Sequence, residues 1–354
     1  MREVRKGRGA ASNRSGRYER HRHEAFDDGW GTIDEEPAPL GTEVRPDASR
    51  TVIARNASPD LGFDRSINVY RGCEHGCVYC YARPTHAFLG LSPGQDFESR
   101  IFAKHDAPAQ LERELARPGY TCRMIAMGTN TDPYQPTERR LALTRGVLEV
   151  LERCEHPVGI VTKSALVVRD ADILSRMARR RLATVSLSVT TLDRDLARTM
   201  EPRASTPAKR LEAMKALGAA GVPVGVMVAP IVPGLTDHEM EGILEAAHAA
   251  GAGRAGYVLL RLPREVRELF LEWLSVHAPN RAGRVVSLLQ GMRDGALNDP
   301  HFDSRMTGKG PYAALLAARF ARATQRLGLA RRGPGLDTER FRPPSRDPAQ
   351  LALL

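Results

Sequence analysis

Three cysteines lie close together in the sequence, in the order Cys73-x3-Cys77-x2-Cys80. At this cysteine frequency, chance would produce such a three-cysteine spacing in about one chain in a thousand. Three thiolates on one short loop can bind three irons of a cubane iron–sulfur cluster and leave the fourth iron without a protein ligand. Gly72 and Gly76 allow the loop to curl tightly. The spacing therefore predicts a cluster with one open coordination site.

A zinc ion is the alternative occupant of the same loop, with His75 or His86 as the fourth ligand. His75 lies inside the loop, so its side chain would strain to reach an ion that the flanking cysteines bind. The two remaining cysteines, Cys122 and Cys154, are isolated. An odd total of five cysteines argues against a disulfide framework.

Short β-branched runs alternate with helical patterns from about residue 66 onward. The expected strands are 66–70, 123–127, 158–162, 184–189, 222–231 and 257–260. The expected helices are 108–115, 141–151, 170–180, 207–220, 237–250 and 265–275. Alternation of this kind specifies an α/β fold with a parallel sheet, and six units suit an open, partial (β/α)6 barrel. Functional groups in such sheets gather at the C-terminal ends of the strands.

The cysteine motif follows the first expected strand and has Tyr79 before its last cysteine. In this it resembles the radical S-adenosylmethionine superfamily. The segments 70–73, 80–83 and 128–136 resemble, more narrowly, the spore photoproduct lyase-like group, whose members are often labelled DNA repair photolyases. The resemblance covers residues 67–263 and implies a 4Fe–4S cluster on the three cysteines, with S-adenosylmethionine on the open iron. In that superfamily, one electron from the cluster cleaves the cofactor to methionine and a deoxyadenosyl radical, which abstracts hydrogen from the substrate.

The ends of the later strands match the cofactor site of the superfamily. The resemblance implies that the loop after the second strand meets the methionine amino group and that Lys163 meets the carboxylate. Ser186 and Ser188 alternate on the fourth strand, so their hydroxyls share a face that suits a ribose. The predicted cofactor-binding residues are Gly128, Thr129, Thr131, Asp132, Lys163, Ser186, Ser188 and Ala229. A turn closed by Asp132, a solvated lysine and hydroxyls bonded to neighbouring backbone are the alternatives.

The chain departs from spore photoproduct lyase at the position of the cysteine that returns hydrogen to the product radical. Gly128 and Thr129 occupy that position here. Cys122 lies at the other end of the strand, about 20 Å away by strand rise, and cannot replace it. A tyrosine is the alternative donor, and the candidates are Tyr79, Tyr81 and Tyr134, of which we select Tyr134 as the catalytic residue.

The formal net charge of +10 is concentrated at the C-terminal end. Residues 1–25 carry eight basic and three acidic residues, and residues 26–50 carry two basic and seven acidic ones. Residues 301–354 carry ten basic and four acidic residues. A basic helix is expected over 313–327, where Arg319, Arg322 and Arg326 share a face that could contact a phosphate backbone or simply be solvated.

These patterns divide the chain into four parts. We expect a disordered arm over 1–50, the radical SAM partial barrel over 51–276, a helical basic extension over 277–330 and a flexible tail over 331–354. The tail ends in a pentapeptide that resembles the motif by which bacterial repair proteins dock on the DNA sliding clamp. The residues of this predicted contact are Gln350, Leu351, Leu353 and Leu354.

The 354 residues are 42% hydrophobic, which is enough to form a buried core. No run of about 18 apolar residues and no secretory signal is visible, so we expect a cytoplasmic protein without a membrane partner. The leading hypothesis is a lyase-like radical SAM enzyme that acts on nucleic acid, by DNA repair or base modification, with flavodoxin or ferredoxin as reductant. The alternatives are radical modification of a protein or small metabolite, and a non-enzymatic zinc or cluster protein that binds nucleic acid.

Overall fold

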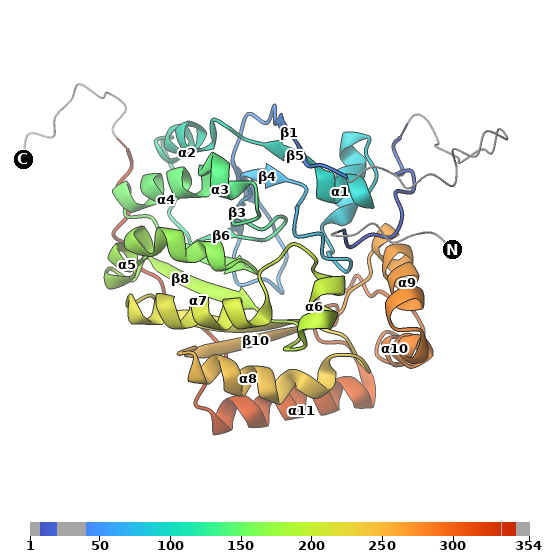
Figure 1. The fold of residues 1–354 in the computed structure, drawn as a ribbon. Helices are drawn as coiled ribbons and strands as arrows, with labels where there is room; N and C mark the ends of the chain where they lie inside the picture. The colour runs from blue at the N-terminus through green and yellow to red at the C-terminus, as the bar shows by residue number, and fades with distance from the viewer. Residues whose placement is uncertain (1–7, 20–39, 334, 345–354) are drawn as a thin grey trace, which may run out of the picture.

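Six parallel strands form the centre of the computed structural model, which describes residues 8–19, 40–333 and 335–344 (Figure 1). The large sheet has the strand order β10-β9-β8-β7-β6-β3-β2. Its strands are β2 (Ile53–Arg55), β3 (Arg65–Ile67), β6 (Ile125–Met127), β7 (Val158–Thr162), β8 (Ala183–Ser188), β9 (Val224–Ile231) and β10 (Arg254–Leu259). Neighbours from β3 to β10 pair in parallel, and β2 pairs antiparallel with β3 at one edge. This arrangement confirms the predicted open, partial (β/α)6 barrel.

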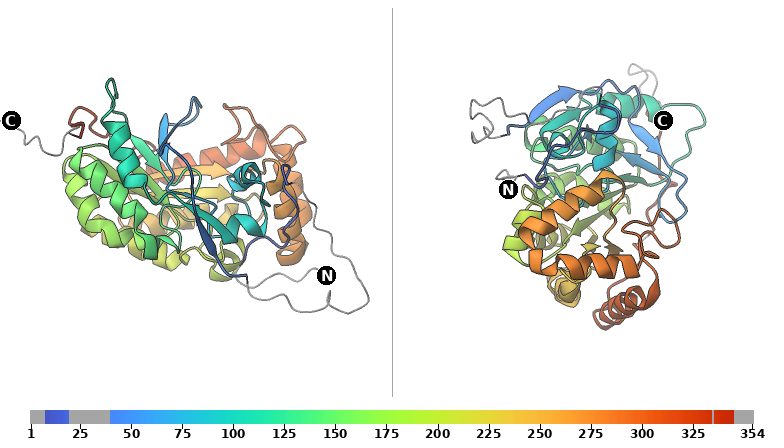
Figure 2. Two further views of the ribbon diagram at one scale, coloured as in Figure 1. Left: turned by 90° about the horizontal axis from the view of Figure 1, so that it is seen from above. Right: turned by 90° about the vertical axis from the view of Figure 1, so that its right-hand side faces the viewer.

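Helices cover the outer face of the large sheet (Figures 1 and 2). They are α2 (Ala107–Leu115), α3 (Glu138–Leu141), α4 (Leu143–Arg153), α5 (Ala171–Arg179), α7 (Pro207–Ala219) and α8 (Met240–Ala249), with the 3-10 helices η3 (Ala165–Asp170) and η4 (Asp237–Glu239). Helix α6 (Arg194–Met200) lies instead beside the cysteine loop, where its Met200 carbonyl accepts from the Val78 amide at 3.0 Å (Figure 1). Each long helix turns an apolar stripe inward. In α5, for example, Ile173, Leu174 and Met177 are buried at helical spacing.

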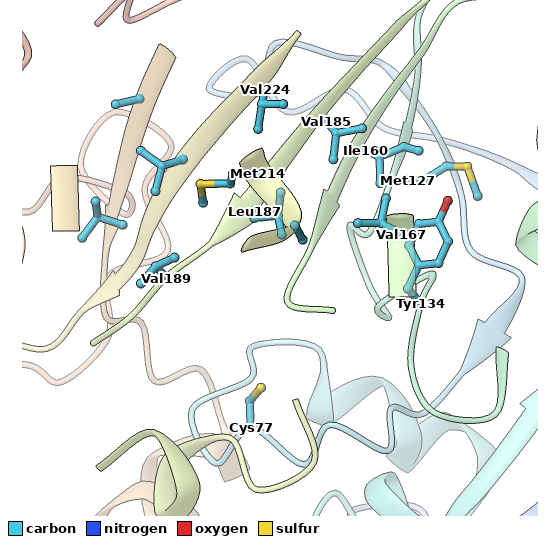
Figure 3. Close-up of a cluster of buried hydrophobic side chains, with 14 of the residues drawn as sticks. Cys77, Met127, Tyr134, Ile160, Val167, Val185, Leu187, Val189, Met214 and Val224 are labelled. Carbon is cyan, nitrogen blue, oxygen red and sulfur yellow. The ribbon is translucent and has the colours of Figure 1, made fainter. Parts of the chain in front are cut away.

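The two faces of the sheet differ in the bulk of their side chains. Toward the helices, Val185 of β8 packs in a core that also contains Met214 of α7 (Figure 3). On the opposite face, the register aligns Val161, Ser186 and Gly225 of three neighbouring strands. Val161 is 38% exposed. The small side chains therefore leave room on the concave face of the partial barrel, where a cofactor would have to fit.

A smaller sheet with the order β1-β5-β4 lies beside the cysteine loop. Its strands are β1 (Glu43–Pro46), β4 (Tyr70–Arg71) and β5 (Arg100–Ala103), and the loop connects to β5 through η2 (Arg83–Leu89) and α1 (Gln95–Ser99). The expected strand 66–70 is thus divided between β3 and β4. The sequence did not predict the smaller sheet, because β4 is too short to show a period and β1 pairs with a distant segment.

Parts of both ends that we expected to be disordered or flexible pack on the barrel. Residues 43–46 form β1, and Phe341 contacts the rings of Tyr120 and His156 at centroid distances of 5.3 and 5.4 Å. Such contacts bury apolar surface, which offsets the entropy of ordering the segment. The predicted clamp contact at Gln350, Leu351, Leu353 and Leu354 lies outside the described residues. The boundaries of the four parts stay predictions.

The C-terminal helices are α9 (Glu265–His277), α10 (Pro279–Gly291) and α11 (Gly310–Arg326). Helix α11 packs outside α8 (Figure 1). Arg319 donates two hydrogen bonds to Glu241, at 2.8 and 2.6 Å, and Arg326 pairs with Glu245. The basic face expected on this helix is therefore largely neutralised by α8, and the excess charge that remains lies elsewhere.

No helix in the described ranges is both long and apolar enough to cross a bilayer.

Candidate functional site

The three cysteines lie on a tight loop between β4 and η2. The Cys73 amide donates to the carbonyl of Phe97 at 2.9 Å, and the Cys80 amide donates to the carbonyl of Cys77 at 3.1 Å. Gly72 has a φ of +77°, and a Cβ there would lie 2.9 Å from the Phe97 oxygen. The glycine is therefore required by both the backbone conformation and the close approach of α1.

The donor set fits a cluster better than a single metal ion. All three thiols are largely buried, and burial raises the pKa of the Cys77 thiol to about 12. Thiolates at such a site need compensating positive charge, which bound metal ions supply. Across the described ranges, no three His, Cys, Asp or Glu side chains converge on a single metal position. His75 faces Asp132 instead, at 3.3 Å, so it is not poised as a zinc ligand.

A fully buried ion pair supports the loop from beneath. The Arg83 guanidinium donates to the carbonyls of Gly76 and Cys77 at 3.0 and 2.9 Å. It also donates to the carboxylate of Glu98 in α1, and neither side chain is exposed. Because arginine offers five donors in a rigid fork, one side chain can bind several loop carbonyls together. This pair fixes the backbone that presents the thiols.

An N-terminal segment completes the support. The amides of Gly9 and Ala10 donate to the two Glu98 oxygens at 2.9 and 2.8 Å. The Arg8 guanidinium donates to the Glu98 carbonyl at 2.7 Å. Farther along, Ser12 donates to Glu272 of α9 at 2.6 Å. Residues 8–12 therefore bridge α1 and α9 and differ from the disorder expected for the arm.

The loop after β6 contains the predicted methionine-binding residues Gly128, Thr129 and Thr131. Asn68, which sequence reasoning missed, organises this loop: its Oδ1 accepts from the amides of Asn130 and Thr131 at 3.0 and 3.3 Å. Gly128 has a φ of +90°, and a Cβ there would lie 1.9 Å from the Val161 carbonyl oxygen. Only glycine permits this contact between the ends of β6 and β7.

Asp132 connects three parts of the site: the loop after β6, the end of β7 and the cysteine loop. Its Oδ1 accepts from the Thr162 hydroxyl at 2.7 Å, and its Oδ2 accepts from the Lys163 amide at 2.7 Å. Burial alone would raise the pKa of Asp132, but the His75 ring and these hydrogen bonds lower it to about 2. Because its oxygens already bind protein donors, Asp132 is a positioning residue here and not an open ligand for an ammonium group.

Lys163 lies between the cysteine loop and a buried polar network. Its Nζ is 5.7 Å from the centroid of the Tyr79 ring and has no carboxylate partner among the described residues. The Tyr79 hydroxyl bonds to Glu201, which also forms a buried ion pair with Arg210. Burial opposes ionisation of Glu201, but Arg210 and Lys163 hold its pKa at about 2. The lysine is thus free to bind an anionic cofactor group.

The hydroxyls on β8 are in different situations. The Ser186 hydroxyl accepts a hydrogen bond from Arg254 at 2.9 Å, so it has a protein partner. Ser188 is buried at the strand end, and its hydroxyl has no partner within the described ranges. Ala229 begins a cis peptide bond with Pro230, and its carbonyl accepts from Thr190 at 3.2 Å. Of these, Ser188 is the residue best placed to meet a ribose.

The structure does not place Tyr134 where we expected a catalytic residue. Its ring is completely buried among Met127, Ile160 and Val167, away from Cys77 (Figure 3). By contrast, Tyr81 directly follows a cluster cysteine and is 51% exposed. Its hydroxyl donates to the carbonyl of Thr129, in the loop after β6. The position of Tyr81 therefore suits a hydrogen relay better than that of Tyr134.

Sequence reasoning also missed the buried charges Arg83, Glu98, Glu201 and Arg210. One signal was present: Arg210 shares a face of α7 with Ala213, Met214 and Leu217, at helical spacing, and all four are buried. A basic residue on an apolar stripe indicates a buried partner.

A family model described as the Radical SAM superfamily matches residues 67–247. Uncharacterized proteins of Mycobacterium tuberculosis and Mycobacterium bovis are 38% identical over 226 residues, which is 63% of this chain and 66% of theirs. The chain thus spans just under two thirds of the length of these relatives. An uncharacterized protein of Methanocaldococcus jannaschii is 30% identical over 173 residues, covering 49% of this chain and 62% of that protein.

Among solved structures, spore photoproduct lyase complexed with dinucleoside spore photoproduct has a TM-score of 0.57 at 15% identity, covering 81% of this chain and 80% of that one. A mutant of that lyase with bound AdoMet and dinucleoside spore photoproduct, also 15% identical, has a TM-score of 0.54 over the same shares. At this identity the likeness concerns the fold alone.

Proposed function

Because the chain belongs to the radical SAM superfamily, which uses a 4Fe–4S cluster and S-adenosylmethionine, we propose that this enzyme carries out radical chemistry on nucleic acid. One observation carries the enzymatic part: three largely buried thiols, those of Cys73, Cys77 and Cys80, lie on one tight loop at the spacing of a cluster with one open iron. When bound, the cluster and S-adenosylmethionine supply a deoxyadenosyl radical that abstracts hydrogen from a substrate.

The residues of the chain hold and orient the cofactors. We assign the three cysteines to three irons and the Lys163 ammonium, which lacks a carboxylate partner, to the methionine carboxylate. Backbone groups of Gly128, Thr129 and Thr131 approach the methionine amino group, and Asp132 keeps that loop in register with β7. The Ser188 hydroxyl contacts the ribose, and the backbone at Ala229 flanks the adenine.

Nucleic acid is the proposed substrate class for two reasons. The fold is similar to that of a lyase solved with a dinucleoside photoproduct. In addition, Arg261, which has no carboxylate partner in the described ranges, and the exposed rings of Tyr81 and Phe302 lie at the mouth of the barrel. Repair by a cysteine hydrogen donor is not proposed, since Gly128 and Thr129 occupy that position. Tyr81 replaces it as hydrogen relay, and flavodoxin or ferredoxin serves as the external reductant.

Isotope transfer tests this proposal. The protein is reconstituted anaerobically with iron and sulfide, reduced with dithionite and supplied with S-adenosylmethionine and deuterated DNA or deuterated RNA. We expect a brown protein that produces deoxyadenosine and transfers deuterium into it from one of the two nucleic acids. A colourless zinc protein would contradict the enzymatic part. Deoxyadenosine that stays free of deuterium with both nucleic acids, but gains it from a protein or metabolite pool, would contradict the substrate class.

A further inference from the structure

Three arginines gather at the end of β10, where the sixth parallel strand opens on the mouth of the barrel. Arg261 lies just after the strand, Arg293 follows α10 and Arg305 lies in the polar turn before α11. Arg305 is neutralised by Asp60, which accepts two hydrogen bonds from it at 2.5 and 2.6 Å. Arg261 and Arg293 have no carboxylate partner within the described ranges.

Arg261 and Arg293, the two arginines without a carboxylate partner, form few hydrogen bonds within the described ranges. Arg261 donates only to the sulfur of Met306, at 3.6 Å, and Arg293 donates only to the carbonyls of Leu260 and Arg305. The Nε atoms of both are buried without a partner, and Arg293 is only 2% exposed. Arginine stays protonated under physiological conditions. Arg261 is only partly buried and has no oxygen acceptor within the described ranges, so its guanidinium is available to an anion from outside.

The two carboxylates nearest Arg261, those of Asp60 and Asp299, both form their hydrogen bonds with other groups. Asp299 accepts from the Ser304 hydroxyl at 2.6 Å and from the His301 amide at 2.9 Å. Burial and the neighbouring Arg305 lower the pKa of Arg261, which agrees with crowded positive charge at this place.

Two exposed aromatic rings flank the arginines. The Arg261 guanidinium lies 5.9 Å from the centroid of the Tyr81 ring, and that of Arg305 lies 4.5 Å from the centroid of Phe302. Tyr81 is 51% exposed and Phe302 is 47% exposed. A guanidinium against one face of a ring holds that ring in place and leaves its other face available for stacking. Tyr81 also directly follows Cys80, so this surface begins beside the cluster loop.

We propose that Tyr81, Arg261, Arg293, Phe302 and Arg305, here called the arginine–aromatic rim, bind single-stranded nucleic acid. Arg261, which is only partly buried, binds a backbone phosphate, and the buried Arg293 adds positive charge behind it. Phe302 stacks on a base next to the reacting nucleotide. A single-stranded or extruded nucleotide is required, because a base inside a duplex stack cannot enter a recessed site. This inference rests on the proposed function and names the surface that would recognise the substrate.

The alternating charges and rings match this ligand better than a protein or a lone anion. A phosphodiester strand presents an anion and a flat ring in each repeat, and the rim offers a guanidinium and a ring twice over. The face of α11 offers no comparable site, since Glu241 and Glu245 neutralise Arg319 and Arg326.

Binding of fluorescein-labelled single-stranded DNA and RNA to the reconstituted holoenzyme tests the rim. We expect Arg261→Gln to weaken the tighter of the two complexes about tenfold. The slope of log K against log salt should also fall by about one, since one phosphate contact is lost. Phe302→Ala should weaken binding about fivefold or more without changing that slope. Arg179→Gln is the matched control, because it removes an exposed positive charge from the last turn of α5, at the opposite end of the barrel.

The outcomes separate this inference from the proposed function. If Arg261→Gln and Phe302→Ala bind as tightly as Arg179→Gln, the rim is not the binding surface, while binding by the wild type leaves the proposed function standing. If the wild type binds neither strand and transfers no deuterium from either, both fail. Arg261→Lys keeps the charge and should restore the salt slope. Iron content equal to that of the wild type shows that each variant retains its fold, and Phe302→Ala, at an exposed position, tests the rim even if Arg261→Gln loses iron.

Discussion

Gly9 lies directly against the carbonyl of Gly76, so closely that a Cβ on Gly9 would be 1.8 Å from that oxygen. Gly9 therefore packs against the backbone of the cysteine loop, at a contact too close for any side chain. The neighbouring amides bind Glu98, which in turn binds Arg83. The cluster loop, α1 and residues 8–10 therefore form one unit, although they are far apart in the sequence.

Gly9→Val should push the N-terminal segment away from the loop and expose the cluster to oxygen. We expect full iron incorporation under anaerobic conditions but faster bleaching of the cluster absorbance in air. Gly41→Val is the matched control, because a Cβ at Gly41 meets nothing within 4 Å. Equal bleaching rates for the two variants would show that the segment does not protect the cluster.

Arg83→Met should destabilise the protein by about 3–5 kcal/mol, because it leaves the buried Glu98 carboxylate without its cationic partner. The carbonyls of Gly76 and Cys77 would lose their donors as well, so less iron should bind on reconstitution. Urea unfolding and iron analysis measure the two effects. Arg153→Met, which removes an exposed ion pair with Glu112, should cost at most about 1 kcal/mol. Similar losses in both variants would contradict a special role for the buried pair.

Gly128→Ala should weaken the binding of S-adenosylmethionine and lower the free energy of unfolding. The new Cβ would meet the Val161 carbonyl at 1.9 Å, in addition to the strain of a positive φ. Gly119→Ala isolates the second effect, since Gly119 has a φ of +76° in open space and should cost only about 1 kcal/mol. Isothermal titration with the cofactor and urea unfolding compare the two. Equal losses of unfolding free energy in the two variants would mean that the backbone at the junction of β6 and β7 can shift to accommodate the new Cβ.

The sequence predicted the elements whose signals are local. The run 158–162 coincides with β7, and the cysteine spacing identifies the loop, because both depend on neighbouring residues alone. The buried pairs could not be found in this way. Glu98 takes donors from Gly9 and Arg83, and which of the many acidic residues becomes buried depends on segments that meet only in the fold. The burial of Tyr134 could not be predicted for the same reason, since it depends on packing against β6 and β7.

The free energy of unfolding should fall as the pH is lowered from about 6.5 toward 4. Burial lowers the pKa of His86 and of His156 to about 4, below the ordinary value of 6.5. The folded state therefore resists protonation that the unfolded state accepts. The contribution of each histidine to the free energy of unfolding is complete above a pH of about 6.5 and decreases as the pH falls below that value. Each histidine contributes a slope of about 1.4 kcal/mol per pH unit within this window.

His86→Gln should remove about half of that slope, and His86→Gln with His156→Gln should remove most of it. Urea unfolding at about pH 6 and about pH 5 gives the slopes, a range that lies above most carboxyl pKa values. An unchanged slope in the double variant would show that other groups carry the acid sensitivity.

Tyr81→Phe should block the return of hydrogen to the product, whereas Tyr134→Phe should not. Each change removes one phenol hydroxyl, but Tyr81 lies exposed beside Cys80, and Tyr134 is enclosed in the core. Cofactor cleavage precedes the relay, so Tyr81→Phe should still form deoxyadenosine while the yield of repaired or modified nucleic acid falls. Mass spectrometry of both products measures this split. The opposite result, with Tyr134→Phe alone losing the nucleic-acid product, would return the relay to the buried tyrosine and require a path through the core that the structure does not contain.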